Sequence, residues 1–393
     1  MLFQTFDKKK DCLMIYKGSE FQENVDPSCT QTWTYANFLK DYDIDYAKIF
    51  VQGKNFNEAC PEELKEELES IETKVKAFLN SAIISGLSLK DVCFYDLIPE
   101  HVLKSWAKLK DATCKHVFDN HSKPANYSSL LNVEKMISEI EFQPLKLDIE
   151  ENDKITVQDK NTYNLLKKCE KHIIYDQFRT ATGRLSTKSN SFPIMTLAKK
   201  YRGALKPTND WLFEIDFNAC ELRVALALLG KEQPEEDLHH WNLVNAFPRS
   251  KDREYAKRLI FAWLYNPKSE STRFSEIYNR DKIKNLHFKD NLVETVYNRK
   301  IDCDEDHAVN YIVQSTAADL VFEQMYKVWK LLEGRKSFIK FCNHDSIMID
   351  FSEDDQLITN DIKELFCNTR FGKFKVNCSA GKNWHDMQKL NIK

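Results

Sequence analysis

Residues 338–351, FIKFCNHDSIMIDF, restrict the fold of this 393-residue chain more than any other stretch. Two alternating apolar runs flank a short polar bend, a pattern that predicts a β-hairpin. Asp345 lies at the bend, where Asn or Gly would serve an ordinary turn. A charged residue at this point is either a surface turn residue or a ligand for a partner.

A second strand pattern also ends near an aspartate. Residues 211–217, WLFEIDF, alternate like a strand, and residues 220–230, CELRVALALLG, are helical and apolar up to a terminal glycine. Asp216 therefore lies between a strand and a helix, where a helix N-cap is as common as a ligand. Together with Asp345 it can form a carboxylate pair that holds two divalent cations about 3.5–4 Å apart, as phosphoryl transfer requires. Oxygen ligands of this kind suit Mg²⁺.

Residues 252–269, DREYAKRLIFAWLYNPKS, carry a basic or aromatic side chain at every fourth position: Arg253, Lys257, Phe261 and Tyr265. On a helix this spacing places them along one stripe. Two cations followed by two rings suit a nucleotide, with the cations at the triphosphate and a ring against the base. An amphipathic core helix with a basic end is the alternative interpretation.

Two further segments suit contacts with nucleic acid. Residues 180–190, TATGRLSTKSN, form a Thr/Ser/Gly/Arg loop of the kind that contacts a phosphate backbone. Residues 310–325, NYIVQSTAADLVFEQM, predict a helix with Asn310 and Gln314 about one turn apart. Amides at that spacing can read groove acceptors, although ordinary buried or surface amides are the alternative.

The charge is unevenly distributed along the chain, whose net charge is −3. Residues 160–207 hold eleven Lys and Arg against two acids, a net of +9, and residues 249–300 hold thirteen against seven, a net of +6. The remainder therefore carries −18. Two basic blocks on an acidic chain indicate polyanion binding on particular surfaces, with solvated helix faces as the alternative.

Composition sets the class of protein. With 42% hydrophobic and 30% charged residues the chain is globular, and its length allows two or three subdomains. We find no apolar run long enough for a membrane span and no signal-peptide pattern at the N-terminus. The eleven cysteines include no C-x-x-C pair, which predicts reduced thiols in a cytoplasmic protein and neither zinc sites nor disulfides.

In order as well as content, these segments resemble the signatures of family A DNA polymerases, the DNA polymerase I type. The resemblance rests on TATGRLS, DFNACELR, the stripe at 253–265, QSTAAD and HDS, and it extends over about residues 160–390. DLHHWNLVNAF at 237–247 and SAGKNWHDM at 379–387 are similar to two further family segments. The resemblance implies an α+β right-hand polymerase fold, in which an antiparallel palm sheet, helical fingers and a thumb surround primer–template DNA.

The resemblance also implies the chemistry. Asp216 and Asp345 would be the metal-binding aspartates of the palm, with the backbone carbonyl of Phe217 as a further ligand and two Mg²⁺ per site (or Mn²⁺). The primer 3′-OH would attack the α-phosphate of a dNTP, and pyrophosphate would leave. Lys257 would be the third catalytic residue, as a general acid towards pyrophosphate.

By the same resemblance, the nucleotide would be held mainly by the helix stripe. Arg253 and Lys257 would bind the triphosphate, Phe261 would pack on the nucleotide, and Tyr265 would lie near the templating base. Glu221 would exclude ribose sugars, next to Phe217.

The primer–template DNA would be bound by a second set of residues. Arg184 and Gln314 would contact its minor groove near the growing end, with Asn310 close by, and His344 would support the primer terminus.

Several positions depart from the family pattern. In the first motif Phe217, Asn218 and Ala219 replace Tyr, Ser and Gln, so the hydroxyl that would pair with Glu221 is missing and a less rigid gate is expected. Asn266-Pro267 follows the stripe, which predicts an early helix end. Ser346 replaces a glutamate, and Asp306 replaces a basic residue.

The expected domains are an N-terminal region of unknown role (1–60), a thumb-like helical region (61–160), a first palm segment (161–230), fingers (231–300) and a second palm segment (301–393). Short strands are expected within CLMIYKG at 12–18 and YAKIFVQG at 46–53. Asp148 and Glu150 are similar to an exonuclease D-x-E signature, but too little chain remains there for that domain. We therefore expect no 3′–5′ proofreading.

The function expected from the sequence is template-directed DNA synthesis by a monomer, with primer–template DNA, dNTPs and replication accessory proteins as partners, no membrane, and a cytoplasmic location (that of the host if the chain is viral). A single-subunit RNA polymerase is one alternative, but Glu221 argues against it. A non-catalytic DNA-binding relative is the other, although it would be expected to lose Asp216, Asp345 or Lys257.

Overall fold

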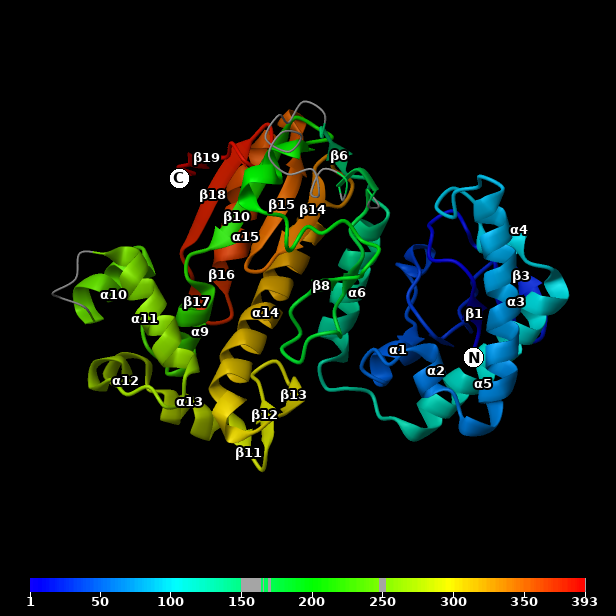
Figure 1. Cartoon of the computed structure of the whole chain (residues 1–393), viewed down its shortest axis with the longest axis horizontal. Helices are drawn as coiled ribbons and strands as arrows, with labels where there is room; N and C mark the ends of the chain where they lie inside the picture. The colour runs from blue at the N-terminus through cyan, green and yellow to red at the C-terminus, as the bar shows by residue number, and fades with distance from the viewer. Residues whose placement is uncertain (150–163, 165, 169–170, 247–251, 393) are drawn as a thin grey trace. The chain divides into compact units, whose positions relative to one another are not determined.

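The chain forms two compact units, Met1–Phe142 and Gln143–Lys393, in the computed structural model (Figure 1). Residues 1–149, 164, 166–168, 171–246 and 252–392 are described. The expected boundary at residue 60 does not separate units, because Phe6 and Tyr16 share one hydrophobic core with Leu68 and Val102 of the later helices. A thumb role for residues 61–160 stays a prediction.

The first unit begins with short strands: β1 (Gln4–Thr5), β2 (Ile15–Lys17), β3 (Glu20–Gln22), β4 (Gln31–Thr32) and β5 (Asp45–Tyr46). β1, β2 and β3 form an antiparallel sheet, whereas β4 and β5 pair in parallel. An isolated parallel bridge joins Leu2, which precedes β1, to Gln31 of β4. β1 itself is an edge strand of the three-stranded sheet.

The helices of the first unit are α1 (Ala47–Phe50), α2 (Phe56–Ala59), α3 (Lys65–Ile84), α4 (Phe94–Leu97), α5 (Glu100–Asn120) and α6 (Tyr127–Glu141). The helical character expected from residue 61 onward is observed in α3, α5 and α6. The strand expected within 46–53 was wrong beyond β5, because the chain turns into α1 and the amide of Val51 donates to the carbonyl of Ala47. Ala47 and Ile49 are both buried at a spacing of two residues, which is the strand period, so the sequence pattern did not reveal this short helix.

One disulfide corrects the prediction that all cysteines are reduced. Cys12 and Cys93 are bonded, with Cα atoms 5.7 Å apart, a separation typical of disulfides. They lie 81 residues apart in the sequence, which is why no local spacing pattern revealed them. The other cysteines of the described residues are free thiols.

The second unit is organised around a five-stranded antiparallel sheet in the order β14-β15-β10-β18-β19 (Figure 1). Its strands are β10 (Trp211–Phe217), β14 (Phe338–Asn343), β15 (Ser346–Phe351), β18 (Val376–Gly381) and β19 (Gln388–Leu390). The predicted strand at 211–217 and the predicted hairpin are confirmed. The β10–β15 register pairs Asp216 with Ser346, and the β10–β18 register pairs Asp216 with Asn377.

The longer helices that the structure describes in the second unit are α9 (Cys220–Leu228), α10 (Leu238–Ala246), α11 (Arg253–Tyr265), α12 (Thr272–Tyr278), α13 (Arg280–His287), α14 (Glu305–Leu332) and α15 (Thr359–Cys367). One apolar core joins α9, α11 and α14 through Leu222, Ile260, Trp263 and Ile312, all buried. Because each helix contributes its apolar stripe to this core, α11 is held in a fixed position relative to the end of β10.

Shorter strands complete the second unit: β6 (Lys146–Leu147), β7 (Tyr175–Asp176), β8 (Ser186–Thr187), β9 (Leu205–Lys206), β11 (Phe288–Lys289), β12 (Leu292–Glu294), β13 (Lys300–Asp302), β16 (Asn368–Thr369) and β17 (Gly372–Lys373). Asp148 follows β6 and forms an ion pair with Lys206 of β9. Glu150 of the D-x-E pattern lies outside the described residues. Helices and antiparallel sheets together agree with the α+β part of the predicted fold class.

Of the helices in the described part of the chain, none combines the length and the apolar character needed to cross a membrane.

Candidate active site

Two aspartates meet where β10 and the β14–β15 hairpin end. Asp216 is the penultimate residue of β10, and Asp345 lies in the two-residue connection between β14 and β15. The amide of Phe217 donates to the carbonyl of Asp345 at 3.2 Å, which fixes the hairpin end against β10. Asn377 Nδ2 on the other neighbouring strand donates to Asp216 Oδ2 at 3.3 Å. The structure therefore brings together the two carboxylates singled out in the sequence.

The backbone on both sides of this pair is strained. Ala219, between β10 and α9, has φ 55°, and His344, beside Asp345, has φ 56°. Non-glycine residues rarely adopt this left-handed conformation, and when they do it is often at functional sites. The tight connection after Asp216 is thus achieved without glycine.

The carboxylates are held in an environment that disfavours their charge. Burial raises the pKa of Asp216, and the neighbouring Asp345 carboxylate raises it further. Burial likewise raises the pKa of Asp345. Two half-buried carboxylates that repel each other are stabilised by a bound cation, and an all-oxygen donor set matches the preference of Mg²⁺. The residues present therefore fit a divalent cation.

A third acid near the pair was missed at the sequence level. Glu214 precedes Asp216 by two residues and so points to the same face of β10. Its Oε1 accepts a hydrogen bond from Ser346 Oγ at 3.2 Å, and burial raises its pKa. The period-2 pattern of WLFEIDF contained this signal, because an acid on the same face as Asp216 is unusual in a half-buried strand.

A cavity of about 510 Å³ lies over the aspartates. Nine of the residues singled out in the sequence line it: Arg184, Asp216, Phe217, Glu221, Arg253, Lys257, Phe261, His344 and Asp345. They come from the 180–187 loop, β10, α9, α11 and the hairpin. Segments far apart in the sequence thus place two carboxylates opposite the basic and aromatic stripe of α11.

The stripe on α11 is half-buried: Arg253, Lys257 and Phe261 line the cavity, and Tyr265 packs against the core. Asp252 caps the helix by accepting from the amides of Glu254 and Tyr255. Ile260 and Trp263 on the other face are buried in the core. The buried face confirms the amphipathic interpretation, and nucleotide binding by the stripe stays a prediction. The helix ends at Tyr265, just before Asn266-Pro267, as predicted.

Phe217 contributes only its backbone to the cavity wall. Its ring is buried and stacks on Phe366, with centroids 4.5 Å apart, on the opposite face of the sheet from Asp216. A side-chain contact between this ring and a nucleotide is therefore not available. Its carbonyl remains a candidate cation ligand.

Glu221 is held by two partners. Arg184 Nη2 donates to Glu221 Oε1, and the Tyr265 hydroxyl donates to Glu221 Oε2. The expectation of a less rigid Glu221 was wrong, because Tyr265 supplies the hydroxyl that Phe217 lacks. The Tyr265 ring also stacks on Phe261, with an interplanar angle of 24°.

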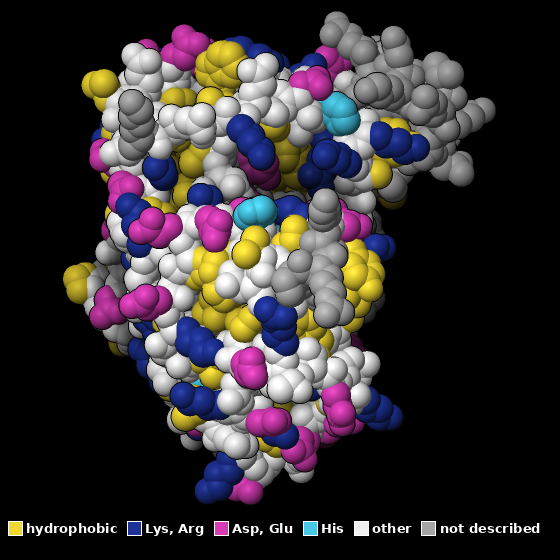
Figure 2. Space-filling model, turned by 90° about the vertical axis from the view of Figure 1, so that its left-hand side faces the viewer, with side chains coloured by type: hydrophobic (Ala, Val, Ile, Leu, Met, Phe, Trp, Pro, Cys, Tyr) yellow, Lys and Arg dark blue, Asp and Glu magenta, His cyan; other side chains and the backbone are white. Residues whose placement is uncertain are grey.

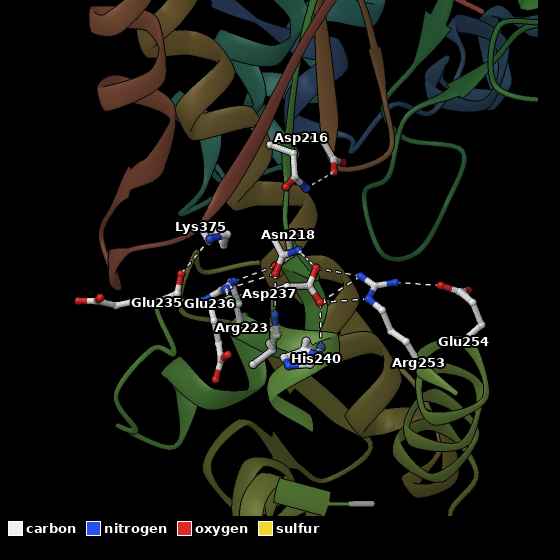
Figure 3. Close-up of polar contacts among 12 residues, drawn as sticks. Asp216, Asn218, Arg223, Glu235, Glu236, Asp237, His240, Arg253, Glu254 and Lys375 are labelled. Carbon is white, nitrogen blue, oxygen red and sulfur yellow. Dashed lines mark hydrogen bonds and ion pairs between the residues drawn. The ribbon is translucent and has the colours of Figure 1, made fainter. Parts of the chain in front are cut away.

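Arg253 is bound to Asp237, a residue that sequence reasoning missed (Figure 3). Its Nη2 lies 2.8 Å from Asp237 Oδ2, and its Nε lies 3.2 Å from Oδ1. Asn218, one of the departures from the family pattern, donates to the same carboxylate at 2.8 Å. Burial alone would raise the pKa of Asp237, but these bonds outweigh burial and lower it. Asp237 thereby ties the end of β10 to the starts of α10 and α11.

His239 is a second residue that the sequence analysis did not single out. It lines the cavity with Arg253 and Lys257 and is 5% exposed. Its Nδ1 has no hydrogen-bond partner within the described residues. Burial and the charges of Lys257 and Arg253 lower its pKa to about 4. A neutral imidazole therefore faces the cavity beside two cations.

The 180–187 loop is positioned by a buried ion pair. Arg299 binds Asp319 through two hydrogen bonds of 3.0 and 2.6 Å. Gly183 has φ +74°, and a Cβ at this position would lie 2.4 Å from Arg299 Cζ. Only glycine fits this close approach. The pair therefore fixes the loop that carries Arg184.

Asn310 and Gln314 lie on α14 outside the main cavity. Asn310 lines a separate hollow of about 90 Å³ beside Tyr265 and Pro267, and its Oδ1 is buried without a hydrogen-bond partner within the described residues. Figure 2 shows Lys and Arg interspersed with Asp and Glu on one face of the molecule, with no uninterrupted basic field there. DNA contacts by these residues stay predictions.

Comparisons with known proteins add information on the fold. No protein-family description and no curated protein matches the sequence. Among solved structures, the chain is similar to the POL domain of Pol1 from M. smegmatis, which was solved in complex with DNA primer-template and dNTP. The TM-score is 0.61 at 14% identity, and the similarity covers 92% of this chain and 88% of that one. At this identity it shows that the two chains share a fold, that of a DNA polymerase domain.

Proposed function

We propose that this protein is a template-directed DNA polymerase that adds dNTPs to a primer 3′-OH. The observation that carries the proposal is the cavity in which the Asp216–Asp345 pair faces Arg253, Lys257 and Phe261 of α11. The structural neighbour, solved with primer-template and dNTP, supports the same substrates. In this proposal the five-stranded sheet is the palm, and α10 to α13 belong to the fingers.

Asp216 and Asp345, with the Phe217 carbonyl, would hold the divalent cations. When bound, these cations activate the attacking hydroxyl and neutralise charge on the phosphates. The repulsion between the two carboxylates favours cation binding, because the positive charge removes the electrostatic cost of holding both in their ionised form. Mg²⁺ fits this donor set, and Mn²⁺ would also bind oxygen ligands.

The side chains of α11 would bind and orient the nucleotide. Arg253 and Lys257 would hold the triphosphate, and neutral His239 can donate a hydrogen bond to it between them. Lys257 would give a proton to the departing pyrophosphate. Phe261 would pack on the nucleotide and Tyr265 would lie near the templating base.

The DNA would be bound by groups on either side of the carboxylate pair. Arg184 and Gln314 would contact the minor groove of the primer–template, with Asn310 near them. His344, at the hairpin bend, would support the primer terminus. A helical region of the first unit would act as the thumb.

A primer-extension assay tests the proposal against its two alternatives. With a labelled primer–template and Mg²⁺, the protein is expected to extend with dNTPs and much less with rNTPs. Preferential extension with rNTPs would identify an RNA polymerase. Tight primer–template binding without extension by any nucleotide, with Mg²⁺ or Mn²⁺, would identify a non-catalytic DNA-binding protein.

Glu221→Ala is expected to weaken sugar discrimination at least tenfold, about 1.4 kcal/mol. The wild-type carboxylate is fixed by Arg184 and Tyr265, so it forms a rigid wall where a ribose 2′-OH would project. Removing that wall opens space for the hydroxyl. The measurement is the ratio of kcat/KM for matched dNTP and rNTP in single-nucleotide incorporation.

The exposed Glu232→Ala is the matched control, expected to leave that ratio unchanged. Tyr265→Phe, which removes only the hydroxyl bonded to Glu221, is expected to shift the ratio in the same direction by about threefold. Ratios for Glu221→Ala and wild type that agree within twofold would remove Glu221 from the gate.

A labelled primer with a mismatched 3′ end is expected to remain intact with Mg²⁺ and no dNTP. Within the described residues, the group of three potential metal ligands that lie close together is Asp7, Cys12 and Cys93. Its two cysteines form a disulfide. Asp148 of the D-x-E pattern does not belong to this group and forms an ion pair with Lys206. Shortening of the primer that persists in Asp345→Ala but is lost in Asp148→Ala would overturn the absence of proofreading.

A further inference from the structure

The first unit contains a second cavity, of about 400 Å³, which is lined by residues of that unit alone. The floor of the cavity is formed at the C-terminal end of β1, by Thr5, Phe6 and Asp7. Thr34, just after β4, also lines it. β1 pairs with β2 and is an edge strand of its sheet, so the cavity lies at the end of an edge strand. The volume falls in the range of small-molecule sites, roughly 300–1,000 Å³.

The cavity carries a surplus of positive charge. Four lysines and two acids line it, a net of +2: Lys8, Lys9, Lys90, Lys110, Asp7 and Glu141. Lys9 Nζ bonds Asp7 at 2.6 Å, and Lys8 Nζ lies 3.9 Å from Glu141. An anion would therefore enter a site whose acids are already paired.

Lys110 is placed differently from the other lysines. Its Nζ donates to the carbonyl of Thr5 at 3.2 Å and lies 4.1 Å from the centre of the Trp106 ring. Within the described residues no carboxylate is bonded to it. Burial lowers its pKa to about 8, so holding its charge without an anion costs free energy. A bound anion next to Lys110 would favour its charged form and offset part of that cost.

The remaining walls are apolar and aromatic. Phe6, Phe94, Phe142 and Leu89 line the cavity, and Lys9 Nζ lies 4.4 Å from the centre of the Phe94 ring. Ring faces next to ammonium groups suit a planar base attached to a phosphate, because the base can stack while the phosphate pairs with the cations. A bare inorganic ion would leave the apolar walls unused.

We propose that this cavity binds a mononucleotide, with its phosphate at Lys110 and its base against the half-exposed Phe94. The site is distinct from the candidate active site and does not depend on the proposed polymerase function. All of its parts lie within Met1–Phe142, one compact unit.

Photolabelling of the full-length protein with 8-azidoadenosine 5′-monophosphate, followed by proteolysis and mass spectrometry, tests the proposal. Labelled peptides are expected to include residues 5–9 or 89–94. Unlabelled AMP is expected to compete at a concentration at least tenfold below that needed for adenosine or inorganic phosphate. Any label on residues 253–265 reports the candidate active site separately.

Lys110→Met is expected to reduce labelling of these peptides at least tenfold. Lys108→Met, which replaces an exposed lysine on the same helix, is expected to leave labelling within twofold of wild type.

Phe94→Leu keeps the charges and is expected to weaken competition by AMP at least fivefold without changing competition by inorganic phosphate. Thermal unfolding of each variant shows whether it is folded. No label in the first unit, labelling by Lys110→Met within twofold of wild type, or equal competition by AMP and inorganic phosphate would each overturn the proposal.

Discussion

Asp216→Ala and Asp345→Ala are each expected to reduce primer extension at least about 10³-fold, a loss of about 4 kcal/mol of transition-state stabilisation. Either substitution removes one of the two carboxylates at the end of β10 and the hairpin bend, and with it an oxygen ligand for the cations. Affinity for primer–template is expected to stay within about threefold, because such affinity comes mostly from Lys and Arg contacts to phosphates.

The measurement is single-turnover extension, combined with binding of Mn²⁺ followed by electron paramagnetic resonance. Mn²⁺ affinity is expected to fall in both variants, which separates loss of a ligand from loss of activity alone. Ser346→Ala, which removes a hydroxyl bonded to Glu214, is the neighbouring control and is expected to be mild. Extension by Asp216→Ala or Asp345→Ala within tenfold of wild type would contradict the role assigned to the pair.

Lys257→Ala is expected to lower kcat/KM for dNTP by about 100-fold, about 2.7 kcal/mol. Lys257 lines the cavity one turn after Arg253. Burial raises the pKa of Asp216 and Asp345, and the charge of Lys257 partly offsets that rise, which places Lys257 near the two carboxylates. A cation on the triphosphate acts in both the ground state and the transition state, so KM is expected to rise and kcat to fall.

Arg258→Ala is the matched control, since Arg258 is the next residue on α11 and is exposed. It is expected to leave both constants within twofold. If Lys257→Ala also left kcat and KM within twofold of wild type, the stripe on α11 would be an ordinary amphipathic helix face that does not bind the nucleotide.

Local patterns in the sequence predicted the elements that carry the site. The alternation of WLFEIDF gave β10 with its observed bounds, and the period of α11 placed Arg253, Lys257 and Phe261 on one face. Both patterns are short-range, since strand and helix periods follow from backbone geometry alone. The convergence of Asp216 and Asp345 in one sheet followed from the family resemblance.

Contacts between distant residues were not predictable in this way. The Tyr265–Glu221 bond spans 44 residues, and the Arg253–Asp237 pair spans 16. The disulfide of Cys12 spans 81. Such pairs depend on how the helices pack, and no spacing rule encodes them. Asp237 lies just before α10, where an aspartate is a common helix cap, so its position in the sequence does not indicate that it also binds Arg253 and Asn218.

Template-directed incorporation of single nucleotides measures the central claim most directly. Four primer–templates that differ only in the templating base are each offered the four dNTPs one at a time with Mg²⁺. Wild-type protein is expected to extend the primer with the complementary dNTP at least about 10²-fold more efficiently than with any other. Extension that ignores the templating base, or no extension by protein that binds the primer–template, would contradict the account.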